Sequence, residues 1–184
     1  SCIDSADNKE ALRHILVDVG KKMVAYGLVD SFFGNISQRH GNKLILSKTA
    51  ARLDQLTDNL VTLDRHTLTP LGMLATSELP AHSAITSLPH VSVLLHGHPR
   101  VPVALSLLHP IGPHTIAGIP VVTGEGGVGG LAKNLYQLFH ETNHRACIVQ
   151  GHGLFCISEH GSYDALRTML AHDSICKDYV RGVI

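Results

Sequence analysis

Two histidines separated by one glycine, His96 and His98, follow directly after the apolar run Val91–Leu95. Residues i and i+2 of a strand point to the same side, so both imidazoles leave one face together if the strand continues through them. Two neutral imidazoles held in this way begin a binding site for a transition metal, most often zinc. Histidine pairs also occur at solvated strand edges, so this pair alone does not establish a metal site.

Two further residues have the chemistry to complete such a site. Glu78 lies at the start of a predicted helix, and His152 lies between two glycines. A third imidazole would leave zinc at least one position open to substrate oxygens, and a carboxylate beside the cation could transfer protons. Each residue also has a purely structural interpretation, because Glu78 suits a helix N-terminus and His152 suits a turn. The metal-site hypothesis therefore requires that His96, His98, His152 and Glu78 converge.

Composition narrows the classes of function. The chain has 184 residues, with 15 lysines and arginines against 15 aspartates and glutamates, so charge does not favour nucleic acid or an anionic membrane as a partner. Its apolar runs are far shorter than the roughly 20 residues of a membrane span, and no basic leader precedes an apolar segment. We expect one domain over residues 1–184, located in the cytoplasm, with neither nucleic-acid nor membrane partners.

Cysteine and histidine counts carry less information. The four cysteines are widely spaced and form no C-x-x-C pair. Cys147 and Cys156 lie in apolar segments, which predicts reduced core residues rather than disulfide partners. Most of the 14 histidines lie in polar or loop contexts, where surface or capping roles are the ordinary interpretation.

The elements that must position the candidate residues follow from hydrophobic periodicity. Helices are expected from Asp7 or Asn8 to Gly27, from a Ser77 N-cap to Thr86, from Val101 onward, over 131–142 and over 163–180. Strands are expected over 32–37, 43–46, 60–63, 91–95, 119–122, 146–149 and 154–158. Several neighbouring strands are joined by short turns, which predicts an α/β or α+β domain whose mainly antiparallel central sheet is flanked by helices.

Five short motifs follow one another along the chain. They are Gly34-Asn35-Ile36-Ser37, Ser47-Lys48-Thr49-Ala50, Thr76-Ser77-Glu78 with His82 one helical turn later, His96-Gly97-His98-Pro99 and Gly151-His152-Gly153-Leu154. Each motif is modest by itself, but in this order they resemble the class II aldolase/adducin family. The resemblance covers nearly the whole chain and implies the fold of that family.

The resemblance also implies a reaction. In the family, zinc or another divalent transition metal would be held by His96, His98, His152 and Glu78, and Glu78 would also move protons in catalysis. The implied enzyme is a metal-dependent carbon–carbon lyase, which cleaves or forms a carbon–carbon bond in a sugar phosphate through an enediolate. The substrate is expected to be a sugar phosphate or a related hydroxy-carbonyl compound. His82 has two interpretations that stay open, a helix-packing role and a supporting role behind the metal ligands.

The implied phosphate site is less typical. In the family, backbone amides and hydroxyls of three turns bind the phosphate, and the matching residues here are Gly34, Asn35, Thr49, Ala50, Thr76 and Ser77. Lys48 and Ala50 stand where the family usually has proline and glycine. Alanine costs about 1 kcal/mol or more in a left-handed conformation, so a different loop shape is possible. Lys48 could supply a cation for the phosphate or be solvated.

The resemblance further implies an assembly and a general acid. Family members form active sites between the subunits of a four-fold tetramer, so a homotetramer is expected. A tyrosine between the H-x-H motif and the third histidine serves as the acid in the aldolase. Tyr136 is the only tyrosine in that interval and lies within a predicted helix, a poor position for the role. Tyr179 could reach the site of a neighbouring subunit.

Three alternatives remain open. The same metal site serves sugar-phosphate 4-epimerases and related decarboxylases and dehydratases of the family, and the adducin branch is a non-catalytic binding class. Residues Gly124–Gly129 also satisfy G-x-G-x-x-G between a predicted strand and a predicted helix, the context of a dinucleotide site. Too little chain follows to complete a dinucleotide-binding half, and that interpretation leaves the histidines unexplained.

Overall fold

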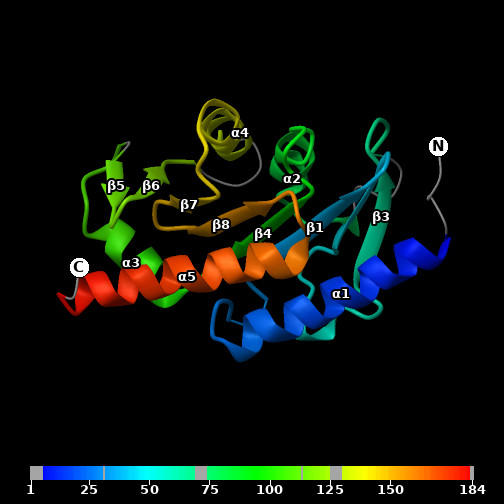
Figure 1. Ribbon diagram of the computed structural model, residues 1–184, viewed down its shortest axis with the longest axis horizontal. Helices are drawn as coiled ribbons and strands as arrows, with labels where there is room; N and C mark the ends of the chain where they lie inside the picture. Colours follow the sequence, from blue (N-terminus) through cyan, green and yellow to red (C-terminus); the bar gives the residue numbers. More distant parts are fainter. Residues whose placement is uncertain (1–5, 31, 69–73, 113, 125–129, 183–184) are drawn as a thin grey trace.

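The computed structural model describes residues 6–30, 32–68, 74–112, 114–124 and 130–182 (Figure 1). These residues form five α-helices, one 3-10 helix and a single sheet of eight strands. The elements in chain order are α1 (Ala6–Ala25), β1 (Asn35–His40), β2 (Lys43–Ser47), η1 (Leu53–Gln55), β3 (Leu60–Asp64), α2 (Leu79–Ile85), β4 (Val93–Gly97), α3 (Arg100–Leu107), β5 (His114–Ile116), β6 (Ile119–Val122), α4 (Leu131–Glu141), β7 (Ala146–Val149), β8 (Gly153–Ser158) and α5 (Ser162–Val180).

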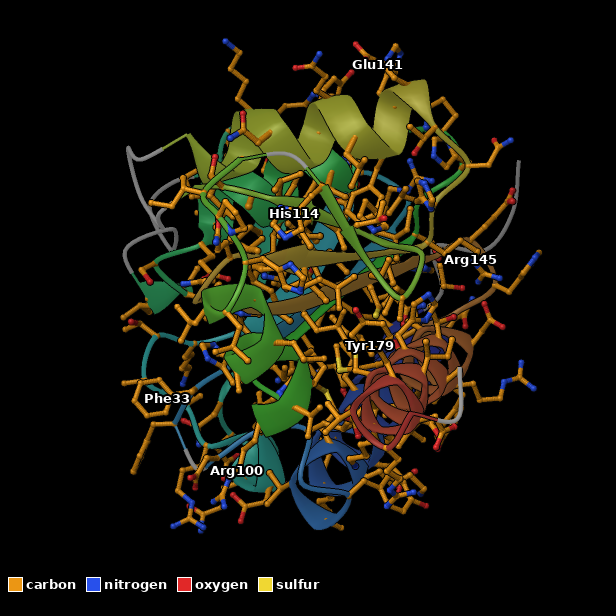
Figure 2. The ribbon with its side chains drawn as sticks, turned by 90° about the vertical axis from the view of Figure 1, so that its left-hand side faces the viewer. Phe33, Arg100, His114, Glu141, Arg145 and Tyr179 are labelled. Carbon is orange, nitrogen blue, oxygen red and sulfur yellow. The ribbon has the colours of Figure 1, made fainter. Side chains whose placement is uncertain are left out.

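The sheet has the strand order β3-β2-β1-β4-β8-β7-β6-β5. Every pairing among the described strands is antiparallel except β6 with β7, which α4 connects. Helices α1 and α5 cover one face of the sheet, and α2 and α4 cover the other (Figure 1). Figure 2 views these layers from one end, with α3 in front of the sheet. The predicted mainly antiparallel sheet with flanking helices is confirmed.

The described residues form three hydrophobic clusters, and the two larger ones hold these layers together. On the face of α1 and α5, Leu16, Val19 and Met23 project from α1 at helical spacing and are fully buried. On the face of α2 and α4, Phe139 and Phe155 are fully buried within the second core. The strands between the two cores therefore carry apolar residues on both sides, which fixes their register.

The register at the centre of the sheet determines what surrounds His96. Asn35 on β1 and Phe155 on β8 are the cross-strand partners of His96 on β4. Glycine is required opposite this ring, because a Cβ atom at Gly153 would lie 2.5 Å from His96 Nε2 and 2.5 Å from the Gly97 carbonyl oxygen. The close approach of β8 to β4 thus depends on a residue without a side chain.

Several expected boundaries shift. The strand expected over 32–37 begins only at Asn35, because Gly34 interrupts the extended backbone at a φ of 110°. The Ser77 N-cap is wrong: α2 begins at Leu79, Glu78 occupies the N-cap position without a capping side-chain bond, and Ser77 is exposed. Proline is accommodated in the first turn of this helix, as expected.

Strand β5 was not expected from the sequence. It forms a hairpin with β6 across Ala117 and Gly118, which have positive φ values of 50° and 78°. This turn requires left-handed conformations at both central residues, where Asn-Gly is the usual signal. Because alanine occupies the first of these two turn positions, the sequence gives no signal for the hairpin.

Three other expectations can be compared with the fold. Within the glycine-rich motif, residues 125–129 lie outside the described part of the chain, and the neighbouring sheet has one parallel pair instead of the parallel sheet of a dinucleotide-binding fold. Cys147 and Cys156 are buried and unpaired, as predicted, and burial raises the pKa of both thiols. No helix in the described ranges is long and apolar enough to cross a membrane.

Candidate active site

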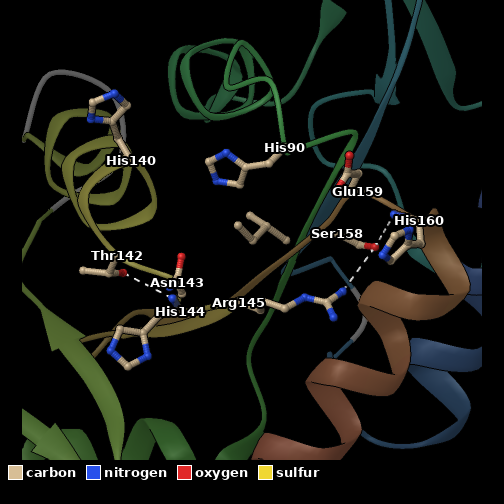
Figure 3. A pocket seen from close by; sticks show the side chains of 10 residues that line it. His90, His140, Thr142, Asn143, His144, Arg145, Ser158, Glu159 and His160 are labelled. Carbon is tan, nitrogen blue, oxygen red and sulfur yellow. Dashed lines mark hydrogen bonds between the residues drawn. The ribbon is translucent and has the colours of Figure 1, made fainter.

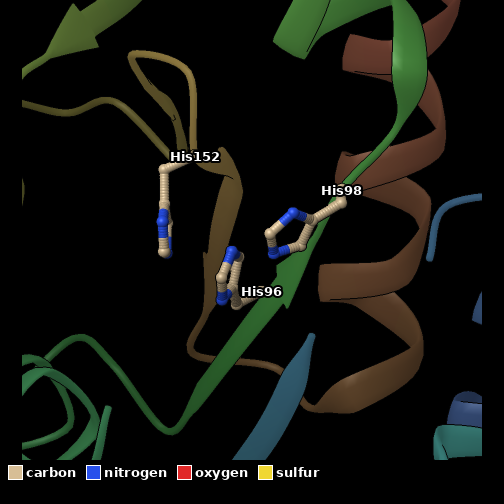
Figure 4. Close-up of side chains that lie close together, drawn as sticks. All are labelled: His96, His98 and His152. Carbon is tan, nitrogen blue, oxygen red and sulfur yellow. The ribbon is translucent and has the colours of Figure 1, made fainter. Parts of the chain in front are cut away.

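Three histidines converge at one end of the central strands (Figure 4). His96 lies in β4, His98 follows it directly after the strand, and His152 lies in the turn between β7 and β8. One ring nitrogen from each histidine lies within 4.8 Å of the other two. The ring centroids of His96 and His98 are 4.6 Å apart, and those of His96 and His152 are 4.9 Å apart. The structure therefore brings His152 to the His96 and His98 pair, which lies more than 50 residues earlier in the sequence.

Glu78 connects two of these rings. Its Oε1 lies 2.7 Å from His152 Nε2, and its Oε2 lies 2.7 Å from His96 Nδ1. The residue is only 5% exposed. Burial alone would raise the pKa of this carboxyl, but the hydrogen bonds from His152 and His96 outweigh that effect and bring the pKa well below its usual value. Glu78 is therefore ionised among three imidazoles.

Burial favours the neutral form of two of these imidazoles, His96 and His98. Burial lowers the pKa of His98 to about 4, and burial also lowers the pKa of His96. The His96 ring is stacked on Phe155 with centroids 4.0 Å apart and an interplanar angle of 11°. Neutral imidazole is the form that binds a metal, and three imidazoles with one carboxylate form a donor set that zinc and related divalent ions accept. The residues present therefore fit a divalent transition metal.

A hollow of about 200 Å³ opens onto this cluster. Its lining contains every residue that the sequence assigned to the site, together with two phenylalanines and a lysine: Phe32, Phe33, Gly34, Asn35, Lys48, Thr49, Ala50, Thr76, Ser77, Glu78, His96, His98 and His152. Drug-sized ligands occupy pockets of roughly 300–1,000 Å³. The hollow thus suits a smaller molecule.

Two loops contribute Lys48, Thr49, Ala50, Thr76 and Ser77 to the lining of this hollow. The Thr49 amide donates to the Leu74 carbonyl at 3.0 Å, and the Thr76 amide donates to the Ser47 carbonyl at 3.2 Å. These bonds occupy two amide N–H groups that could otherwise donate to an anion. The Thr49 and Ser77 hydroxyls have no hydrogen-bond partner among the described residues, so they remain available to a ligand.

Both departures from the family pattern have a structural explanation. Ala50 adopts a φ of 53°, so alanine takes the left-handed conformation that glycine would adopt more easily. Lys48 lines the hollow, but its ammonium group donates to the Asp58 carbonyl at 2.7 Å. The loop keeps its backbone turn, and the lysine charge is directed to the neighbouring loop.

Some contacts at the site were not expected from the sequence. The side-chain amide of Asn35, expected at the phosphate, donates to Glu78 Oε2 at 3.0 Å and accepts a hydrogen bond from His82 Nε2. Phe155, which stacks on His96, gives no sequence signal beyond its place in a buried strand. Tyr136 lies on the exposed side of α4, and Tyr179 projects from α5, across α3 from Phe33 in Figure 2. Neither tyrosine lines the hollow.

A second histidine-rich hollow of about 430 Å³ lies elsewhere in the molecule (Figure 3). Its lining includes four exposed histidines, His90, His140, His144 and His160. Their rings are spread around the hollow and do not meet (Figure 3). Among the described residues, only the group of His96, His98 and His152 meets the geometric requirement for holding a metal.

Comparison with known structures supports the fold. L-fuculose-1-phosphate aldolase from Thermus thermophilus is 24% identical, with 93% of each chain covered and a TM-score of 0.75. YgbL from Escherichia coli is 20% identical over 91% of this chain and 87% of that one, with a TM-score of 0.80. A sugar-phosphate aldolase from Thermotoga maritima is 17% identical over 97% of each chain, with a TM-score of 0.68. At such identities the similarity shows the fold and not the reaction.

Sequence comparison gives the family. No curated protein matches the chain. The model of the class II aldolase and adducin N-terminal domain matches residues 14–180, which is most of the sequence. The resemblance inferred from the five motifs is thereby confirmed, and this chain belongs to the class II aldolase and adducin N-terminal domain family.

Proposed function

We propose that this protein is a zinc-dependent or related divalent-metal-dependent aldolase, which cleaves or forms a carbon–carbon bond in a small sugar phosphate. The observation that carries the proposal is the convergence of His96, His98 and His152 within 4.8 Å, with the Glu78 carboxylate hydrogen-bonded to two of them. An adducin-like binding module has no need for three converging imidazoles around a buried, ionised carboxylate. That arrangement is expected of an enzyme.

The ligand set follows from the donor atoms. His96, His98 and His152 would hold the metal, and Glu78 would share the site. When bound, the cation supplies Lewis-acid polarisation of a carbonyl group and of the hydroxyl next to it. The three uncharged histidines do not reduce the positive charge of the ion, so its polarising effect is preserved.

Glu78 is assigned the proton transfer. Aldol cleavage removes a proton from a substrate hydroxyl and delivers one to the carbon released from the broken bond. A single ionised carboxylate beside the substrate can accept the first proton and donate the second. Glu78 has both oxygens directed at the histidines and lines the hollow, so a substrate bound there would lie within its reach.

The phosphate group is assigned to the lining residues that are not histidines. Gly34, Asn35, Thr49, Ala50, Thr76 and Ser77 all line the same hollow as the metal cluster. The unpartnered hydroxyls of Thr49 and Ser77 can donate to phosphate oxygens. The volume of about 200 Å³ supports a short substrate whose phosphate and reacting carbonyl are only a few bonds apart.

A homotetramer is part of the proposal. Leu107 at the end of α3 and Leu108 and Ile111 just after it are 65%, 80% and 88% exposed, and large exposed apolar groups favour contact with another subunit. Light scattering would then give about four times the chain mass of 19.8 kDa. The unpaired cysteines in the core support a reducing compartment such as the cytoplasm.

The proposal is tested by metal analysis and by activity on the same preparation. Tag-free protein, analysed by plasma mass spectrometry, should hold about one zinc or similar ion per chain. The loaded protein should release dihydroxyacetone phosphate from ketose 1-phosphates, lose this activity with a chelator and recover it with the metal. Metal binding with conversion of one pentulose phosphate epimer into the other would support the 4-epimerase instead. A protein that binds no metal, even after incubation with zinc, would contradict the enzymatic function.

A further inference from the structure

A series of hydrogen-bonded, buried polar side chains connects Glu78 to Ser37. It consists of Asn35, His82 and Ser37, which are 7%, 0% and 0% exposed. The side-chain nitrogen and oxygen atoms that connect these residues all have hydrogen-bond partners within the protein. Buried polar groups of this kind are costly unless each is hydrogen-bonded, and a fully bonded network fixes the orientation of its members.

The direction of each hydrogen bond in this series can be deduced from one group, the Asn35 side-chain oxygen. The Asn35 carbonyl oxygen can only accept, and His82 Nε2 is its partner, so Nε2 carries the proton. An uncharged imidazole has one donor and one acceptor nitrogen, so Nδ1 accepts a hydrogen bond from the Ser37 hydroxyl at 2.6 Å. The Asn35 amide nitrogen then faces Glu78 Oε2 at 3.0 Å. Every hydrogen bond donates toward Glu78.

The opposite amide orientation is unfavourable. If the Asn35 amide were rotated by half a turn, its oxygen would face the Glu78 carboxylate, and two acceptors would be brought together. His82 prevents that rotation because its N–H requires an oxygen. The position of His82 is itself secured, since it follows Glu78 by one turn of α2, with its amide bonded to the Glu78 carbonyl at 3.1 Å. Glu78, Asn35 and His82 therefore form a closed unit.

We propose that His82 is a positioning residue, which acts through Asn35 to hold the Glu78 carboxylate in its reactive direction. The proposal rests on the proposed function, in which Glu78 transfers the proton. His82 does not line the hollow, and its ring nitrogens are hydrogen-bonded to Asn35 and Ser37, so substrate binding does not depend on it directly. Its loss should slow proton transfer and leave substrate affinity nearly unchanged.

The test compares two substitutions of this residue. His82→Leu removes both nitrogens, and His82→Gln restores a donor near the Nε2 position. We expect His82→Leu to lower kcat about 10- to 100-fold, the range for residues behind metal ligands, with KM within about twofold. His82→Gln should recover most of that loss. His90→Leu is the matched control, because His90 is hydrogen-bonded to the Phe139 carbonyl in the second hollow and should leave kcat unchanged.

A double-mutant cycle tests whether the effect passes through Asn35. Once Asn35→Ala has removed the amide, adding His82→Leu should cost less than twofold further, since coupled residues are not additive. The proposal would be overturned if the effects of the two substitutions on kcat multiplied. It would also be overturned if His82→Gln were as slow as His82→Leu while its unfolding free energy equalled that of the wild type. Should His82→Leu fail to fold, Ser37→Ala replaces it and should lower kcat severalfold.

A spectroscopic measurement separates this proposal from the proposed function. In metal-free protein labelled with ¹⁵N-histidine, the His82 resonances should be those of a neutral ring protonated at Nε2. They should be identified by their disappearance in His82→Gln. This tautomer is expected whether or not the protein proves to be an aldolase. A ring protonated at Nδ1 would contradict the donor order and with it the positioning role, whatever the activity assays give.

Discussion

The two histidine-rich hollows differ in what lies behind the rings. Around Glu78, the ring nitrogens of three histidines approach within 4.8 Å, because the C-terminal end of β4 lies beside the N-terminal end of β8 and the β7–β8 turn. In the second hollow, the histidines are exposed and separate, and His144 and His160 are anchored through backbone amides bonded to Thr142 and Ser158. The comparison shows that a buried carboxylate and converging strand ends, and not histidine number, bring histidines into the geometry that could hold a metal.

Removing one histidine from each hollow gives the largest expected contrast. His96→Ala should reduce bound metal from about one ion per chain to nearly none, because two imidazoles and a carboxylate remain in a site built for more ligands. His144→Ala should leave the metal content unchanged. Plasma mass spectrometry on both variants makes the measurement, and equal loss from both would place the ion outside the Glu78 cluster.

The carboxylates of the two hollows provide the next contrast. Glu78→Gln keeps the size of the side chain but removes the base, so kcat should fall by about 10²- to 10⁴-fold, with some metal still bound. Glu159 lines the second hollow and is exposed, so Glu159→Gln should retain full activity. Steady-state kinetics with saturating metal would measure both. A fully active Glu78→Gln variant would remove Glu78 from proton transfer.

A single methyl group tests how tightly the first cluster is packed. In Gly153→Ala, the new Cβ would lie 2.5 Å from His96 Nε2, so the ring or β8 must move. Overpacking of this kind costs about 1–3 kcal/mol of unfolding free energy, and metal affinity should fall with it. Urea unfolding and metal titration would show both effects. An unchanged affinity would mean that His96 is free to shift without consequence for the ion.

Beside the second hollow, the polar residues are expected to contribute stability and not chemistry. A hydrogen bond from Ser158 at 2.7 Å, together with the charges of Arg145 and Arg167, lowers the pKa of Asp164 to about 2. A lowered pKa means that the stabilisation is complete above the ordinary value of 3.8 and is lost as pH falls toward 2.

Asp164→Asn should therefore destabilise the protein by about 1 kcal/mol or less at pH 7, and the difference from wild type should shrink below about pH 4. Urea unfolding across this pH range is the measurement. Asp178→Asn is the control, because its pair with Arg181 is exposed and 3.7 Å long. A difference that persists at pH 2 would show that the Asp164 charge is not its source.

The sequence was sufficient to predict that His96, His98 and His152 converge, because the signals for these residues are local. The i, i+2 spacing of His96 and His98 predicts that their side chains share one side of a strand, and the glycines beside His152 predict a turn. The bonds of Asn35 to His82 and Glu78 could not be foreseen, since they depend on β1 pairing with β4 and on the direction of α2. The left-handed Ala50 shows the same limit, because a loop held by Leu74 keeps a conformation that alanine disfavours by itself.

The wide spacing of the cluster along the chain has a consequence for folding. Asn35 precedes Glu78 by 43 positions, and His152 follows it by 74. Contacts that close such long loops form late, because the chain loses entropy before they can stabilise it. No fragment that stops before His152 contains all the ligands. On the proposed function, a polypeptide emerging from the ribosome could therefore not bind a metal ion through all three histidines until β8 is able to pair with β4.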